Sequence, residues 1–452
     1  MHRIDTSAGS HPGFSQGLQV AALQDLLSDD EIEAICRHLG HTWRDRIFTP
    51  AVTVRSMVHR ALNPDKSIRA VLTDLTVADD RLEQTPADAS WCEARSRLPQ
   101  ALWAELLRHS VKRLGALTAG QFLYKGRQVF LIDGSTLSMP DTPDLVEHFG
   151  YSGSRHGLSR FPLGRITFIV LTGANCVWDY RFANYRTSED TQLHQMWERL
   201  PIGSICVFDR NFSSFYNLAK LLQRGIDSVS RLHHQRDPNK LISQGTPIGE
   251  DQWIVELDLT PHRRRKYKDP SLPQHLCVRL IRLEFLRKGK PKLIWLVTTL
   301  LDARCHSRQE IGELYRSRWE VETRIGELKT TLKMNVLRSK GAQSVHHDVA
   351  ATVLAYNLLR TVIHQAARQD HAPADRISFA SAIKMVLAYS MPLRMAQPTQ
   401  RQKIYSQMLS DIARCRNPVR PGRVEPRRIK RNCKMYPWLN TPRALAREKC
   451  LS

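Results

Sequence analysis

The chain has 452 residues, enough for two or three domains that each bury a core of their own. Its 67 lysines and arginines exceed its 44 acidic residues, and the formal net charge is +23. This excess favours a polyanionic partner, most simply nucleic acid, over an anionic membrane surface, because no stretch has the pattern of a long, basic, amphipathic helix. No apolar run is long enough to span a membrane, and the N-terminus lacks an apolar signal region. We therefore expect a cytoplasmic, nucleoid-associated protein with no membrane partner.

The first part of the chain has the pattern of helices. Residues 1–20 are rich in glycine, serine and histidine and predict a loose tail. Ser28 and Glu31 have the spacing of a capping box, and apolar residues then recur with a helical period to about residue 115. We expect an all-α domain over residues 21–115. The sequence leaves open whether this domain binds DNA or serves packing and dimerisation.

The pattern changes to strands near residue 128. "QVFLIDGS" predicts a short buried strand that ends at Asp133, and "RITFIVLTG" and "CVWDYRF" predict a hairpin. A helix follows with Ser188 as its cap, and "SICVFDRNF" predicts a buried strand that ends at Asp209. A further helix and strand complete an α/β unit over residues 116–235.

Residues 236–292 interrupt this alternation with strand-like segments and basic loops, among them "HRRRKYKD", and predict a β-rich insertion. The α/β pattern resumes over 293–370, and 371–452 form a helical region with a basic tail. The tail is rich in proline, glycine and arginine, so it either orders on a phosphate backbone or only solubilises the protein. The nine cysteines are scattered without metal-ligand spacing, which predicts reduced thiols and no zinc site.

The segment 315–329, "YRSRWEVETRIGELK", follows a capping box at Ser307 and predicts a continuous helix. At roughly 100° per residue, four side chains share one stripe beside the apolar face. These are Tyr315, Arg318, Glu322 and Lys329, whereas Glu320 and Glu327 are expected to face solvent. The competing interpretation is an ordinary surface helix with an Arg318–Glu322 pair.

Asp133 and Asp209 each follow a buried strand, where the loops of an open sheet build binding sites. A single aspartate at such a place is often only a helix cap. Two of them, with Glu322 at the edge of a buried helix face, supply three carboxylates in a basic protein. Such a set suits two divalent cations, which prefer oxygen ligands and can catalyse phosphoryl transfer.

These residues carry a resemblance to a known family. "LIDGSTLSMPDTP", "VFDRNF" and the signature Y-x2-R-x3-E-x6-K resemble the DDE transposases of the insertion-sequence-four family, from about residue 28 onwards. The resemblance implies a ribonuclease-H-like core interrupted by the β-rich insertion. Asp133, Asp209 and Glu322 would hold two Mg²⁺ or Mn²⁺ ions. The implied activity is cut-and-paste transposition: cleavage at terminal inverted repeats through a hairpin intermediate, and joining to target DNA by a dimer.

The resemblance also implies roles for five further residues. Arg318 and Lys329 would grip phosphates near the scissile bond, and Tyr315 would donate a hydrogen bond to a phosphate oxygen. Arg210 is another phosphate candidate, or else it forms a surface ion pair. Trp295 would stack on a base flipped out of the duplex, or else it is a core residue of an apolar strand.

Two rival functions stay open at this point. A metal-dependent nuclease of the same fold would hydrolyse DNA without joining it to a target. A catalytically silent descendant of a transposase would only bind DNA, although the complete set of three carboxylates argues against this.

Overall fold

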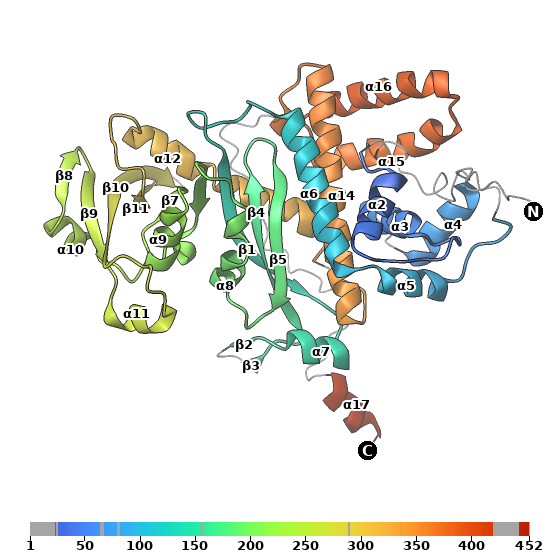
Figure 1. Cartoon of the computed structure of the whole chain (residues 1–452), viewed down its shortest axis with the longest axis horizontal. Helices are drawn as coiled ribbons and strands as arrows, with labels where there is room; N and C mark the ends of the chain where they lie inside the picture. Colours follow the sequence, from blue (N-terminus) through green and yellow to red (C-terminus); the bar gives the residue numbers. More distant parts are fainter. Residues whose placement is uncertain are drawn as a thin grey trace, which may run out of the picture. The chain divides into compact units, whose positions relative to one another are not determined.

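The computed structural model describes residues 23, 26–63, 67–78, 82–154, 157–287, 290–335, 337–418 and 443–451 (Figure 1). It divides into two compact units. The helical unit comprises 1–117 and 327–438, and the sheet unit comprises 118–326 and 439–452. The predicted loose tail, 1–20, and the centre of the predicted basic tail, 419–442, lie outside the described residues.

The helical unit has helices where the sequence pattern predicts them. Ser28 and Glu31 form both bonds of the predicted capping box at the start of its first described helix. The longest helix is α14, which is buried along most of its length and packs against α6, α3 and α16. The main helices are α2 (Asp29–His38), α3 (Pro50–Leu62), α4 (Ile68–Ala78), α5 (Asp88–Arg97), α6 (Gln100–Leu117), α14 (Ala342–Gln369), α15 (Phe379–Met395) and α16 (Pro398–Arg414).

A mixed nine-stranded sheet organises the other unit, with the order β5-β4-β1-β6-β7-β11-β10-β9-β8. Its strands are β1 (Val129–Ser138), β4 (Leu163–Leu171), β5 (Cys176–Asn184), β6 (Ile205–Phe208), β7 (Asp227–Arg231), β8 (Thr246–Gly249), β9 (Gln252–Asp258), β10 (His275–Arg287) and β11 (Lys290–Thr298). Helices α8 (Glu189–His194) and α9 (Phe215–Gln223) connect the central strands and pack on β4 and β7. The structure thus has the predicted mixed α/β pattern.

Strand β1 is longer than predicted. The sequence pattern ended it at Asp133, but it continues to Ser138 because β4 pairs with it in antiparallel register as far as Ser138–Leu163. Only the first part of β1 pairs in parallel with β6, from Val129–Ile205 to Ile132–Phe208. Asp133 therefore lies inside a strand, at the point where its parallel neighbour ends.

The strands of residues 236–292 extend the same sheet. β11 pairs with β7, and β10, β9 and β8 then follow at one end of the sheet (Figure 1). The basic stretch "HRRRKYKD" is mostly a short helix, α11 (Pro261–Tyr267), rather than the predicted loop. Thr260 caps this helix through its side chain, and a proline occupies the first turn, so the local sequence explains the helix.

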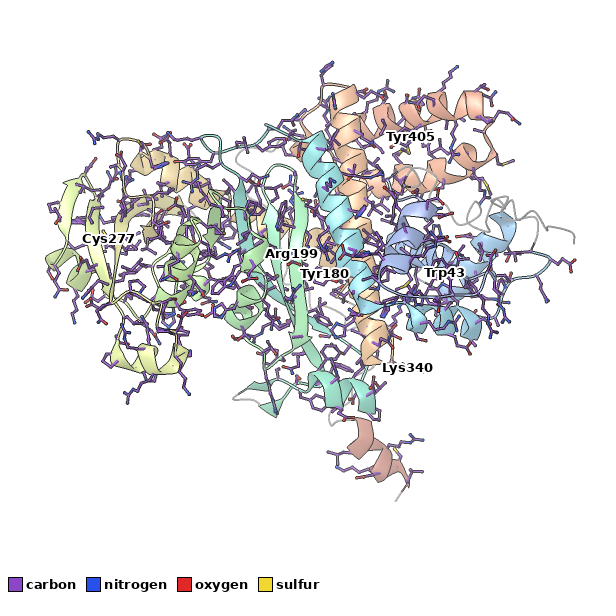
Figure 2. All side chains as sticks on the ribbon, viewed as in Figure 1. Trp43, Tyr180, Arg199, Cys277, Lys340 and Tyr405 are labelled. Atoms are coloured by element: carbon purple, nitrogen blue, oxygen red, sulfur yellow. The ribbon has the colours of Figure 1, made fainter. Side chains whose placement is uncertain are left out.

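Two inferences from composition concern thiols and membrane segments. The described cysteines are free thiols; Cys36, Cys176 and Cys206 are buried, whereas Cys277 is exposed on β10 (Figure 2). In the described part of the chain, no helix is both long and apolar enough to cross a membrane.

Candidate active site

Asp133 and Asp209 lie side by side, each directly after the last parallel pair of β1 and β6. Ile132 of β1 pairs with Phe208 of β6, and each aspartate is the next residue on its strand. Neighbouring strands lie about 4.8 Å apart, so the two backbones are close. The sequence analysis placed each aspartate after a buried strand, and the structure puts the two beside each other, although β1 continues past Asp133.

Asp209 is not used as a structural cap. It precedes the short 3-10 helix Arg210–Phe212 in the N-cap position, but its side chain makes no capping hydrogen bond. Its carboxylate makes no hydrogen bond or ion pair within the described residues. The structural explanation that usually accounts for a single aspartate after a strand therefore does not apply here.

Arg318 connects Glu322 to Asp133. Glu322 lies on α13 (Trp319–Gly326), a helix that packs against β1. The Arg318 guanidinium donates to Oε1 of Glu322 at 2.9 Å and lies 3.7 Å from Oδ2 of Asp133. The Arg318–Glu322 pair of the competing interpretation thus exists, but Arg318 is only 7% exposed and also faces the first aspartate. A buried arginine that faces two carboxylates differs from a residue of an ordinary surface helix.

The electrostatics of the site are those of a partly buried acidic group. The pKa of Asp133 is raised to about 6, mainly by burial and in part by the nearby Glu322 and Glu189 carboxylates. Arg318 and the backbone N–H of Gly134, which donates to Oδ1 of Asp133 at 2.8 Å, oppose this rise. The negative charge at this position is therefore incompletely compensated by the protein itself.

The predicted continuous helix is broken into three pieces. α12 (Arg308–Arg316) begins at the Ser307 capping box as expected, a turn at 317–318 separates it from α13, and Glu327–Thr331 form a π-helical turn. Tyr315, Arg318 and Glu322 still lie together, with the Arg318 guanidinium 6.0 Å from the Tyr315 ring centroid. An ideal helical phase cannot be extended across such breaks.

The prediction that Glu327 faces solvent is wrong. The Glu327 side chain is 15% exposed and pairs with Arg360 of α14. The Tyr356 hydroxyl also donates to it at 3.1 Å. Lys329 lies in the same π-helical turn of the helical unit, where burial lowers its pKa.

A cavity of about 1170 Å³ opens beside Asp209 within the sheet unit. Its wall carries five basic and four acidic side chains and includes the two signature residues Tyr315 and Arg318. The other side chains that line it are Arg231, Asp251, Leu283, Glu284, Lys292, Ile294, Arg308, Gln309, Gly312, Glu313, Arg316 and Trp319. A cavity of this size has room for a phosphate-bearing segment, and its arginines and lysine could contact the phosphates.

Two further candidates have different surroundings. Arg210 is exposed and forms no ion pair within the described residues, so the competing surface-pair interpretation is not what the structure has. Trp295 is half-buried on β11, with its ring 5.9 Å from that of Trp253. Its neighbour Ile294 lines the cavity. Because successive strand residues point to opposite faces, the Trp295 side chain lies on the other face of the sheet.

Sequence reasoning missed three residues near the site. Trp319 is 56% exposed at the cavity, with the Arg318 guanidinium 4.9 Å from its ring centroid. Arg231 at the end of β7 lines the same cavity. Glu189, the first residue of α8, lies close to Asp133. Trp319 stands inside the signature and could have been found there, whereas Glu189 resembled an ordinary acidic residue in a first helical turn.

Whether divalent cations suit this site depends on its donors. In the described residues, no three side chains among His, Cys, Asp and Glu already converge as a metal cluster. Arg318 instead supplies the positive charge between Asp133 and Glu322. The donors are nevertheless all carboxylate oxygens, which are the ligands that hard divalent cations prefer. The residues therefore fit such a cation chemically.

Comparison with known proteins decides the family. Residues 124–358, slightly more than half of the chain, match the family described as "Transposase DDE domain". The chain belongs to the DDE transposases. It is 26% identical over 318 residues to the transposase InsG for insertion sequence element IS4 of Escherichia coli strain K12, which covers 69% of this chain and 70% of that protein. It is also 31% identical over 134 residues to the putative transposase InsZ of the same strain, covering 29% and 45%.

These matches confirm the resemblance found in the sequence: this is a DDE transposase of the IS4 type. The family match contains Asp133, Asp209 and Glu322, together with the whole signature segment. Members of such a family act on DNA, which is the polyanionic partner that the net charge of +23 favours.

Proposed function

We propose that the protein catalyses cut-and-paste transposition, cleaving DNA at terminal inverted repeats and joining the ends to a target. The observation that carries this proposal is the placement of Asp133 and Asp209 on neighbouring strands, with Arg318 facing both Asp133 and Glu322. Asp133 and Asp209 follow the last pair of β1 and β6, and Glu322 is tied to Asp133 through Arg318. The central strands with α13 would form the ribonuclease-H-like core.

Asp133, Asp209 and Glu322 would hold two Mg²⁺ or Mn²⁺ ions. When bound, the cations would activate the attacking oxygen and stabilise the leaving one. The protein's own part is to keep the carboxylates together, and Arg318 does so by facing both Glu322 and Asp133. Burial of this arginine at 7% exposure fixes its position before DNA arrives.

The cations around the cavity would hold the DNA backbone. Arg231, Lys292 and Arg316 line it, and Arg318 would add a forked contact to the phosphate at the scissile bond. Tyr315 would donate its hydroxyl to a phosphate oxygen, since burial raises its pKa and keeps the proton in place.

Three candidates lie outside the cavity lining. Arg210, next to Asp209 and exposed, would contact phosphate as well. Lys329 and Trp295 keep their proposed roles, phosphate binding and stacking on a flipped base at the hairpin stage. Joining two ends to one target would require a dimer in the DNA complex.

A plasmid assay tests the proposal and separates its rivals. A supercoiled plasmid carrying the ends of the element that encodes this chain would be incubated with the protein and Mg²⁺. Nicked, hairpin and joined products are expected, and each should vanish with EDTA. Cleavage without hairpin or joined products would favour the nuclease, and specific binding with no cleavage would favour the silent DNA-binding protein.

A further inference from the structure

A fourth carboxylate lies against the candidate active site. Glu189 is the first residue of α8, a helix that Ser188 caps through a hydrogen bond from the backbone N–H of Thr191. The cap fixes where the helix starts, and α8 packs on β4 and β5. The position of Glu189 is therefore set by regular structure and not by a free loop.

Glu189 is in direct contact with the backbone beside Asp133. A Cβ atom at position 134 would overlap the Glu189 carboxylate, so a larger residue after the first aspartate would displace that carboxylate from its place. The φ angle of Gly134 is not in the left-handed region, so backbone conformation does not explain this glycine. The space that the glycine leaves is occupied by a carboxylate.

The charged neighbours of Glu189 include Asp209, and Glu189 itself acts on Asp133. Burial raises the pKa of Glu189, and the Asp190 and Asp209 carboxylates raise it too, while Arg165 opposes the rise. Glu189 in turn contributes to the raised pKa of Asp133. It thus lies within electrostatic reach of both Asp133 and Asp209.

Its own pairing contrasts with that of the next residue. Asp190 accepts a hydrogen bond at 2.9 Å from the side-chain amide of the buried Asn217. The Glu189 side chain makes no hydrogen bond or ion pair within the described part of the chain. Of two adjacent acids at this helix start, one has a structural partner and the other faces the site with its oxygens unused.

We propose that Glu189 is a fourth carboxylate of this active site and shares in holding the divalent cation next to Asp133. The inference rests on the proposed metal-dependent function. It explains why position 134 is a glycine, which leaves room for the carboxylate. It also explains why the Glu189 side chain has no ion-pair partner within the described residues of a chain whose net charge is +23.

Binding of Mn²⁺ to the full-length protein without DNA tests this inference. Electron paramagnetic resonance measures free Mn²⁺ in titrations of the wild type, Glu189→Gln, Asp133→Asn and the control Glu198→Gln. Glu198 is an 81% exposed side chain of the same unit, near Arg224. We expect Asp133→Asn and Glu189→Gln to weaken Mn²⁺ binding at least about tenfold. Glu198→Gln should bind as the wild type does.

The outcomes separate this inference from the proposed function. If Asp133→Asn weakens Mn²⁺ binding and Glu189→Gln does not, Glu189 is no ligand and only the inference fails. If the wild type and all variants fail to bind Mn²⁺, the metal-dependent function and the inference fail together. Loss of binding in Glu198→Gln as well would also overturn it, because the effect would then come from net charge.

Thermal unfolding without metal guards against a folding defect. Removing one of several neighbouring negative charges relieves repulsion, so Glu189→Gln should melt at the wild-type temperature or higher. A lower melting temperature would indicate a structural role through Arg165.

A second variant, Gly134→Ala, should also weaken Mn²⁺ binding because its Cβ displaces the Glu189 carboxylate. If it instead bound Mn²⁺ like the wild type, the contact would not matter for the metal.

Discussion

Acidic side chains of the two units differ in whether they have hydrogen-bond and ion-pair partners. In the helical unit, Asp348 receives Arg60 at 3.0 Å, Arg95 at 3.2 Å and the Ser339 hydroxyl at 2.6 Å. In the sheet unit, Asp209 and Glu189 have no such partners within the described residues. In a chain with 67 basic residues, partners are abundant, so carboxylates left without them are arranged for something other than stability.

Two glutamates five positions apart show the same difference. Glu327 receives Arg360 and Tyr356 and is nearly buried. Glu322 keeps 44% of its side chain exposed, and its one ion-pair partner within the described residues is Arg318, which it shares with Asp133. Sequence spacing alone placed Glu322 beside the buried face and Glu327 in solvent, so it missed the buried partners of Glu327. The comparison predicts that Glu327 supports folding and Glu322 supports chemistry.

The largest expected effect is on the reaction of Glu322→Gln. An amide cannot offset the charge of a divalent cation, so cleavage should fall by at least about a thousandfold. The free energy of unfolding should change by less than about 1 kcal/mol, because the side chain is exposed. Product formation and urea unfolding of the same preparation measure both. An active Glu322→Gln beside an inactive Glu320→Gln would show that the wrong glutamate has been assigned.

Glu327→Gln should show the opposite behaviour. Arg360 is 1% exposed, and removal of its carboxylate partner leaves a buried charge uncompensated. Breaking a buried pair in this way costs about 3–5 kcal/mol, which urea titration would measure. The fraction that folds should still cleave DNA. A fully stable but inactive Glu327→Gln would erase the distinction between the two glutamates.

The helical unit should also lose stability in acid through His347. This side chain is fully buried and accepts the Trp103 indole N–H at 3.0 Å, and burial, aided by Arg95, lowers its pKa to about 4. The unfolded chain takes up the proton near pH 6.5, so this contribution is complete above that pH. It is lost as the pH falls towards 4, by up to about 3 kcal/mol.

Urea titrations across this pH range check the His347 prediction. His347→Gln keeps a hydrogen-bond acceptor for Trp103 but cannot take up a proton. Its stability should therefore depend less on pH between 6.5 and 4 than that of the wild type. Parallel pH profiles for the two proteins would contradict the assigned cause.

The smallest expected effect concerns cations of the cavity. Arg316 lines it, is exposed and makes no ion pair within the described residues. Arg316→Ala should reduce the slope of log binding constant against log salt by about 1, because one phosphate contact is lost. The control Arg60→Ala should reduce stability and leave the slope unchanged, since Arg60 is already paired with Asp348. Equal slopes for all three proteins would remove the cavity from the DNA interface.

The predictable part of this structure is the part that local sequence encodes. Capping boxes at Ser28 and Ser307 start helices as their spacing predicts. The apolar runs before Asp133 and Asp209 form neighbouring strands, which suffices to bring the two aspartates together. Parallel pairing itself is a long-range property, but buried apolar runs between helices favour it.

The missed part depends on contacts between distant segments. Glu327 was misplaced because a turn and a π-helical turn reset the helical phase, and its partner Arg360 comes from another helix. The extension of β1 beyond Asp133 depends on β4, which continues to pair with it. Glu189 was missed since nothing local distinguishes it from Asp190, and its contact with Gly134 exists only in the fold.

Asp209 offers the most direct test of the central claim that unpaired carboxylates of the sheet unit are catalytic. Mg²⁺-dependent nicking of a plasmid with the element's ends should be measured for the wild type, Asp209→Asn and Glu198→Gln. The account predicts that Asp209→Asn binds the ends but nicks none of them, melts no lower than the wild type, and differs from a fully active Glu198→Gln. Normal nicking by Asp209→Asn would contradict the account.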